Sequence, residues 1–244
     1  MQAINHKLTH AYQPTSTTCG YASLAMLLSH YDEKLSVNDL ISQTPQAADK
    51  SGTSIGSVTA QLATWCVRQG YKAKFVSFDL LITDLSWAGL DSDAMAEKLE
   101  AVREIRDVPQ VGGKYWSKFY VQAYIDFIRA GGVLSVQPHP TSQLLYAWLQ
   151  DGPIYANICS SVVHGTGRAR YPEPETDKRL VVPDDIHGTV GTHSVVIYGN
   201  DEAGNFLVAD PWDGLEVAKP ETILCGIMAA QLECDNQIFQ LSKT

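Results

Sequence analysis

Residues 19–31 read CGYASLAMLLSHY, and the organisation of the chain follows from them. Apolar side chains fall on nearly every side of this stretch, which is typical of a helix that runs through a core rather than over its surface. Pro14 favours an extended approach, and Thr17 and Thr18 can cap the first free N–H groups. We therefore expect a buried central helix with Cys19 in its first turn.

Shorter periodic segments follow this helix. Apolar residues at helical spacing predict further helices, and alternating or β-branched runs between turn residues predict strands. The expected helices are 36–44, 55–69, 95–102, 116–128 and 144–149, and the expected strands are 72–78, 133–137, 154–159, 193–199 and 206–210. We predict an α+β fold in which an N-terminal helical lobe, with its central helix starting at Cys19, packs on a C-terminal antiparallel β-sheet.

Composition argues against several classes of protein. The 244 residues carry 18 Lys and Arg against 27 Asp and Glu, a net charge of −9, so we expect no nucleic-acid partner. Uncharged apolar stretches fall far short of the roughly 18 residues that span a membrane, so we expect no membrane partner. The N-terminus lacks a signal-like apolar core, and the five cysteines are scattered without a CxxC pair. These features predict a cytoplasmic chain with free thiols, although export without an N-terminal signal would leave the same pattern.

Cys19 and Gln13 form the first candidate pair for chemistry. A thiolate at a helix N-terminus feels the positive end of the helix dipole and unpaired N–H groups, and both lower its pKa. Gln13 lies six positions earlier, and its amide and the N–H of Cys19 can donate to an oxyanion on an attacked carbonyl. Alternatively, Cys19 is a buried structural thiol, and Gln13 closes a local loop by bonding its own backbone.

A hairpin late in the chain supplies the candidate base. His193 opens a β-branched strand, and Asp210 ends the next strand. If a four-residue loop joins them, so that Gly199 faces Gly204, His193 lies directly opposite Asp210, with the two Cβ atoms about 5 Å apart. Asp210 can then orient the imidazole toward Cys19, whereas a register shift of one residue would put the pair on opposite faces.

These motifs resemble those of papain-like peptidases of the C39-like group, which process bacteriocin leader peptides. The resemblance spans most of the chain and rests on Gln13 with CGYA at 19–22, on LQDGPI at 149–154, and on the His193 strand followed by Asp210-Pro211. It implies a papain-like fold with four site residues: Cys19 as nucleophile, His193 as general base, Asp210 as orienting residue and Gln13 as oxyanion donor.

The same resemblance implies one C39-like, papain-fold domain over residues 1–244. Two segments are larger than a minimal leader peptidase needs, a helical insert at about 84–130 and a long loop at about 160–192. The second segment is rich in glycine and proline, and connections of that length are usually functional or disordered. We interpret it as a lid or specificity loop beside His193.

The favoured function is a thiol-dependent hydrolase that cleaves a peptide or amide bond in a peptide or protein substrate through a Cys-His-Asp triad and an acyl-enzyme. A papain-like transpeptidase, acyltransferase or deamidase would use the same chemistry, and a catalytically silent peptide-binding module would keep only the fold. Asp213 is the nearest rival of Asp210. No metal or organic cofactor is expected, because no second ligand pair accompanies Cys159 and His164.

Overall fold

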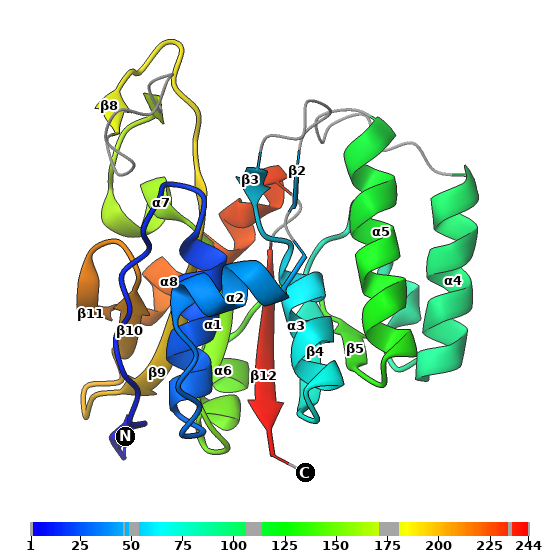
Figure 1. Cartoon of the computed structure of the whole chain (residues 1–244), viewed down its shortest axis with the longest axis horizontal. Coiled ribbons are helices and arrows are strands. Elements are labelled where there is room, and N and C mark those ends of the chain that lie inside the picture. The colour runs from blue at the N-terminus through cyan, green and yellow to red at the C-terminus, as the bar shows by residue number, and fades with distance from the viewer. Residues whose placement is uncertain are drawn as a thin grey trace.

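A mixed β-sheet of eight strands runs through the middle of the computed structural model (Figure 1). The structure describes residues 2–45, 47–48, 54–105, 114–170, 181–233 and 236–243. The strands of the sheet are β1 (Ile4–Asn5), β4 (Lys72–Ser77), β5 (Val133–Val136), β6 (Ile154–Cys159), β9 (Thr192–Asn200), β10 (Phe206–Asp210), β11 (Gly214–Ala218) and β12 (Gln237–Ser242). They lie in the order β11-β10-β9-β6-β12-β4-β5, with β1 paired to β9 outside this path. These pairings are antiparallel except that of β4 with β5.

Helices cover both faces of this sheet. They are α1 (Cys19–Ser29), α2 (Val37–Gln43), α3 (Thr59–Arg68), α4 (Ser92–Ile105), α5 (Lys114–Arg129), α6 (Ser142–Leu149), α7 (Ser160–His164) and α8 (Pro220–Ala229), with 3₁₀ turns η1 (Leu85–Trp87) and η2 (Ala230–Glu233). Helices α1, α2, α3 and α5 lie on one face, and α6 and α8 on the other (Figure 1). Two small ribbons, β2 (Ala47–Ala48) with β3 (Ser54–Gly56) and β7 (Ala169–Arg170) with β8 (Val182–Pro183), stand at the top of the view.

Helix α1 is buried because its sequence is apolar on all sides. Residues 20–28 are all buried, including Ser23, whose hydroxyl donates to the carbonyl of Ser194 on β9 at 2.7 Å. The helix begins at Cys19, as predicted. The predicted cap is wrong in detail, because the Thr18 side chain makes no capping hydrogen bond and its oxygen instead accepts from the N–H of Thr15. No threonine hydroxyl at that position therefore occupies the N–H groups of the first turn.

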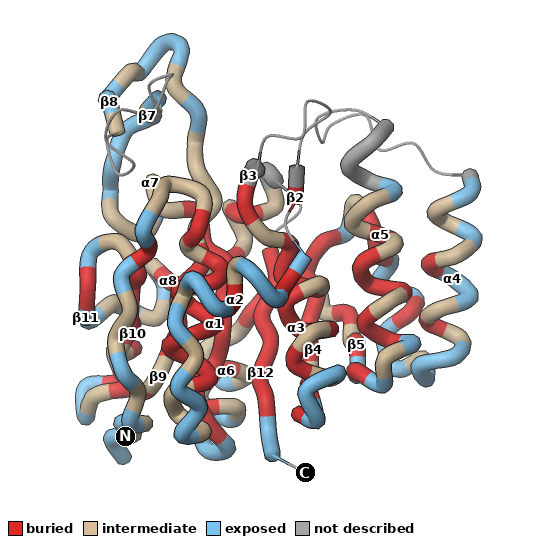
Figure 2. Tube along the Cα trace, viewed as in Figure 1, coloured by how far each residue is buried: buried red, intermediate tan, exposed pale blue. Residues whose placement is uncertain are grey.

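Apolar side chains form a core on each face of the sheet, because neighbouring residues of a strand point to opposite faces. On the α1 side, the ring of Phe239 stacks against Phe75 and Tyr155, with centroids 6.3 and 4.6 Å away. On the other side, Ile238 and Ile158 pack with residues of α6 and α8. Figure 2 shows the resulting run of buried residues along β12 and α1. The sheet therefore holds the ends of β6, β9 and β10 in fixed positions at one edge of the core.

The prediction of an α+β fold is confirmed, with differences in extent. Strands β6 and β10 have the predicted bounds. The sheet is larger than a C-terminal antiparallel one, because β1, β4 and β5 join it from earlier in the chain and β4 pairs with β5 in parallel. Ile55 lies in β3 rather than in α3. The reason is Gly56, whose φ of 125° lies outside the helical region and separates the two elements.

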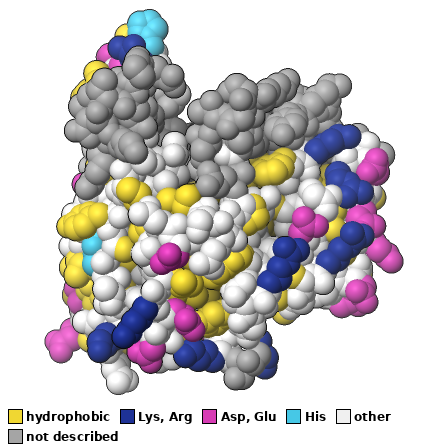
Figure 3. All heavy atoms as spheres, viewed as in Figure 1, with side chains coloured by type: hydrophobic (Ala, Val, Ile, Leu, Met, Phe, Trp, Pro, Cys, Tyr) yellow, Lys and Arg dark blue, Asp and Glu magenta, His cyan; other side chains and the backbone are white. Residues whose placement is uncertain are grey.

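The two segments expected as inserts contain defined elements. The described part of 84–130 holds η1, α4 and α5, and oppositely charged side chains alternate over the surface of these helices (Figure 3). The described part of 160–192 holds α7, β7 and β8, whereas residues 106–113 and 171–180 lie outside the described residues. Among the helices that the structure describes, none has the length and apolarity needed to cross a membrane.

Candidate active site

Cys19 occupies the N-terminus of α1, where the thiol faces the end of the sheet. Its Sγ lies 4.0 Å from Oγ of Ser194 on β9. Burial raises the pKa of the Cys19 thiol, but a hydrogen bond and charge attraction from the His193 imidazole, together with bonds from Ser194, outweigh burial and hold this pKa below its ordinary value. The fold therefore brings the Cys19 thiol of α1 next to the His193 imidazole of β9.

His193 and Asp210 form a buried ion pair beside this thiol. Nε2 of His193 lies 2.8 Å from Oδ1 of Asp210, and the two side chains are 10% and 0% exposed. Burial lowers the pKa of His193, but hydrogen bonds and charge attraction from Asp210 and Cys19 raise it to about 10. Burial raises the pKa of Asp210, and the neighbouring imidazoles of His164 and His193 lower it well below the usual range. Because Nε2 faces the carboxylate, Nδ1 is the ring nitrogen left to face Cys19.

The contact between His193 and Asp210 depends on a β-bulge that the sequence did not reveal. The hairpin loop is longer than predicted, since Asn200 pairs with Phe206 rather than Gly199 with Gly204. The register then shifts between Leu207 and Val208, which pair with Gly199 and Ile197 and leave Tyr198 as the extra residue of β9. The predicted direct pairing of His193 with Asp210 is wrong. Ala209 pairs with Val196, so Asp210 comes level with Val195.

The same bulge explains why the two side chains still meet. Val195 and His193 are two residues apart on β9 and share a face, so Asp210 lies diagonally across from His193 on that face. Without the bulge, Asp210 would come level with Val196 and point to the opposite face. One inserted residue thus brings the carboxylate to the imidazole.

Gln13 is buried near His193 and Asp210. Hydrogen bonds join its N-terminal segment to the end of β10. The N–H of Gln13 donates to the carbonyl of Pro211 at 2.9 Å, and Nε2 of His10 lies 2.8 Å from the carbonyl of Asp210. The Gln13 side chain donates from Nε2 to the carbonyl of Thr15 at 2.7 Å, so the local loop-closing bond considered from sequence is present. An amide nitrogen carries two N–H groups, so this single bond does not use the full donor capacity of Gln13.

Ser194, which sequence reasoning missed, connects the thiol to a buried polar network. Its hydroxyl accepts from the Tyr155 hydroxyl at 2.8 Å and donates to Oδ1 of Asn157 at 2.9 Å. The amide of Asn157 in turn donates to the hydroxyl of Thr59 at 2.6 Å. Four polar side chains from β9, β6 and α3 therefore lie behind Cys19 and fix the position of Ser194. Ser194 could have been identified from the sequence as a polar residue at an inward position of an otherwise apolar strand.

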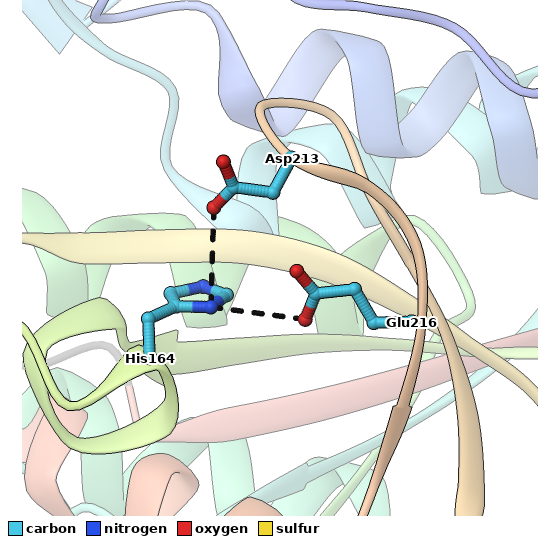
Figure 4. A group of neighbouring side chains, drawn as sticks. All are labelled: His164, Asp213 and Glu216. Atoms are coloured by element: carbon cyan, nitrogen blue, oxygen red, sulfur yellow. Dashed lines mark ion pairs between the residues drawn. The ribbon is translucent and has the colours of Figure 1, made fainter.

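His164, at the end of α7, was considered from sequence only as a metal ligand with Cys159, and its place beside Asp210 was missed. Its Nε2 lies 3.3 Å from Oδ2 of Asp210. Its Nδ1 lies 3.9 Å from Oδ2 of Asp213 and 3.7 Å from Oε2 of Glu216, and the three side chains converge in Figure 4. The Asp210 carboxylate facing Nε2 raises the pKa of His164 above its ordinary value, against the effect of burial. Asp213, the rival of Asp210, therefore contacts His164 and not His193.

This cluster is also where the described residues come closest to a metal site. The ligand atoms of His164, Asp213 and Glu216 lie within 4.8 Å of one another, and imidazole with carboxylates is a donor set that divalent transition metals accept. Both ring nitrogens of His164 face carboxylate oxygens, so contacts within the cluster already engage the ring. Cys159 is not a member of this cluster.

A cavity of about 340 Å³ opens beside His193. It lies between the described part of the 160–192 segment and the end of the β9–β10 hairpin, and its walls include Gln13, His164, Arg168, His193, Trp212 and Asp213. The volume falls within the usual range for small-ligand pockets, so part of an extended chain fits it. The segment expected to act as a specificity loop therefore forms one wall of this cavity.

The solved structures that this chain resembles include two with which it shares little sequence identity. One is described as a C39-like peptidase from Bacillus anthracis, with 10% identity, a TM-score of 0.46 and coverage of 100% of this chain and 99% of that chain. The other is a double-glycine-motif protease from an AMS/PCAT transporter, solved with the leader peptide, with 12% identity, a TM-score of 0.41 and coverage of 100% and 99%. No protein-family model and no curated protein matches the sequence.

Proposed function

We propose that this chain is a papain-like, thiol-dependent hydrolase that cleaves a peptide or amide bond through Cys19, His193 and Asp210. The observation that carries the proposal is the His193 imidazole, held by the Asp210 carboxylate at 2.8 Å on one side and bonded to the Cys19 thiol on the other. A lowered thiol pKa beside a raised imidazole pKa favours a thiolate–imidazolium pair at neutral pH. That pair is the nucleophile and acid that acyl transfer needs.

In the first half of the reaction, the Cys19 thiolate attacks the substrate carbonyl and forms a tetrahedral intermediate. The His193 imidazolium then gives its proton to the departing amine, the C–N bond breaks, and a thioester to Cys19 remains. In the second half, neutral His193 takes a proton from water, and the resulting hydroxide attacks the thioester. Collapse of this second intermediate releases the carboxylic acid and restores the thiolate–imidazolium pair.

The oxyanion of each intermediate requires donors that are already in position. The N–H of Cys19 sits in the first turn of α1, where no capping side chain competes for it. The second N–H of Gln13 Nε2 is the other proposed donor, because the first is held by Thr15. Removal of one such donor from an acyl-transfer enzyme typically lowers kcat by about 10² to 10³.

Substrate is proposed to enter through the cavity beside His193, as an extended peptide or protein segment. The wall formed by α7 and the β7–β8 ribbon would then select among substrates, in keeping with a specificity loop within a single papain-like domain of residues 1–244. Acyl transfer to an amine in place of water would use the same catalytic groups. The chemical identity of the product distinguishes this reaction from hydrolysis.

The test is cleavage of a diverse peptide mixture, followed by mass spectrometry with and without an added primary amine. Wild-type protein and the exposed-thiol variant Cys225→Ala are expected to give the same products, whereas Cys19→Ala gives none. Products that gain the mass of water indicate hydrolysis, and products that gain the amine indicate transpeptidation. Undiminished turnover by Cys19→Ala, or the absence of any product from wild type, contradicts the proposal.

A further inference from the structure

Asp210 is shared between two imidazoles. Its Oδ1 accepts from Nε2 of His193 at 2.8 Å and from the N–H groups of Trp212 and Asp213 at 2.6 and 3.1 Å. Its Oδ2 makes no hydrogen bond of good geometry within the described part of the chain, and Nε2 of His164 lies 3.3 Å from it. The side chain of Asp210 is 0% exposed, so water does not reach this oxygen from the surface. His164 is therefore the group that faces the second oxygen.

A buried carboxylate oxygen without a donor is costly, so the position of Oδ2 depends on His164. If His164 withdrew, Asp210 would gain by turning Oδ2 toward another donor, and the nearest donors are those that now bind Oδ1. Rotation of this kind would take Oδ1 away from His193. The orientation of the His193 ring is thus coupled to a residue that lies outside the Cys-His-Asp set.

His164 is itself held by the docking of α7. Ser160, at the start of α7, donates from its N–H and its hydroxyl to the carbonyl of Gly191 at 3.2 and 3.1 Å. Val163 packs onto α8 at Gly226, where a side chain would clash. Asp213 and Glu216 face Nδ1 of His164 from the β11 side (Figure 4). Because α7 also lines the cavity, its position links the cavity wall to Asp210.

We propose that His164 is a positioning residue for the active site: docked α7 places its imidazole on Oδ2 of Asp210, and this contact keeps Oδ1 on His193. The inference rests on the function proposed above and adds a control element to it. The segment 160–192 then has two roles, since it forms the cavity wall and completes the orientation of the base.

The direction of the effect separates this role from simple charge repulsion. If His164 acted only as a positive charge near His193, its removal would favour the His193 imidazolium and make the Cys19 thiolate more abundant at low pH. If it positions Asp210, its removal weakens the Asp210–His193 contact and makes the thiolate less abundant at low pH. The two roles therefore shift the reactivity of Cys19 in opposite directions.

The experiment measures the rate of Cys19 alkylation by iodoacetamide from pH 4 to 10, with the modified residue identified by peptide mapping. His164→Leu removes the donor, and His164→Gln keeps an amide N–H that can reach Oδ2. The control variant is His139→Gln, because His139 is exposed and lies outside the site. We expect the midpoint of the profile to rise by about one pH unit, a tenfold change, in His164→Leu, with partial rescue in His164→Gln and no change in the control.

The outcomes separate this inference from the proposed function. A low midpoint in wild type that stays unchanged or moves down in His164→Leu overturns the positioning role and leaves the proposed function standing. A wild-type midpoint near that of an ordinary thiol overturns the proposed function itself. Near-ultraviolet circular dichroism of each variant checks that its tertiary structure is retained. Equal loss of the folded near-ultraviolet signal in His164→Leu and His164→Gln contradicts the rescue that the inference requires.

Discussion

Ser194 shows how one residue behind Cys19 serves both the stability and the chemistry of the site. It belongs to the strand that carries His193, but it points to the other face, where its hydroxyl contacts Tyr155, Asn157 and the Cys19 sulfur. Tyr155 and Asn157 are buried, and both would lose their hydrogen bond to Ser194 if its side chain were truncated. Polar groups of this kind are worth more to the fold than the average exposed hydrogen bond.

Replacement of Ser194 by alanine is expected to destabilise the chain. The change leaves the Tyr155 hydroxyl and Oδ1 of Asn157 without this partner, and each buried unsatisfied group costs about 1–3 kcal/mol. Urea denaturation should therefore show a lower free energy of unfolding for Ser194→Ala. The exposed Ser92→Ala serves as control and should lie within about 0.5 kcal/mol of wild type. Equal stability of both variants would contradict the network.

The ion pair of His193 predicts how stability depends on pH. The pKa of His193 is raised to about 10 in the folded chain, against about 6.5 when unfolded, so its contribution is fully present below about pH 6.5 and is lost as pH rises toward 10. The difference in unfolding free energy between wild type and His193→Gln should thus be largest near pH 5–6 and shrink toward pH 10. A difference that grows with pH would contradict the pair.

At the level of elements, the parts of the site were predictable but their exact pairing was not. The start of α1 and the strand that carries His193 follow from local patterns of apolar and β-branched residues. The bulge at Tyr198 does not, because a register shift depends on contacts with β1, β6 and β10 that no local pattern encodes. Helix α7 has five residues, too few to show a helical period, so His164 gave no signal.

The docking of α7 on α8 can be tested through one glycine. A Cβ at Gly226 would lie 2.4 Å from Cγ2 of Val163, so Gly226→Ala should push α7 off α8. Alanine favours a helix over glycine by about 1 kcal/mol, so α8 itself should not suffer. We expect the alkylation midpoint of Cys19 to rise in Gly226→Ala, as in His164→Leu.

A second substitution identifies the cause of that shift. Val163→Ala removes the clashing methyl, so the double variant with Gly226→Ala should regain the wild-type midpoint. Val163→Ala alone should leave the midpoint near wild type. A double variant that remains as impaired as Gly226→Ala would mean that α7 docking does not govern the thiol.

Over the whole molecule, the sheet with a core on each face makes this geometry possible. The α+β class could be predicted from the change of pattern along the chain. The strand order could not, because β12, the last strand, inserts between β4 and β6. The pairing of β12 with β4 joins residues 160 to 170 positions apart, and it is decided by packing between distant parts of the chain. Phe239 lies at this junction.

Truncation of Phe239 should cost more stability than truncation of an exposed strand residue. Its ring is 0% exposed and stacks on Phe75 and Tyr155, so Phe239→Ala is expected to lower the free energy of unfolding by about 3–5 kcal/mol. Leu215, on the edge strand β11, is 61% exposed, and Leu215→Ala should change stability by less than about 0.5 kcal/mol. Similar losses in both variants would contradict the placement of β12 at the centre of the core.

The most direct measurement compares two thiols in one molecule. Wild-type protein is treated with limiting iodoacetamide at pH 6, and modification of Cys19 and of the exposed Cys225 is quantified by peptide mapping. A thiolate stabilised by His193 predicts that Cys19 reacts at least about ten times faster than the exposed thiol of Cys225. Reaction of Cys19 no faster than Cys225 would contradict the thiolate–imidazolium pair on which the proposed activity depends.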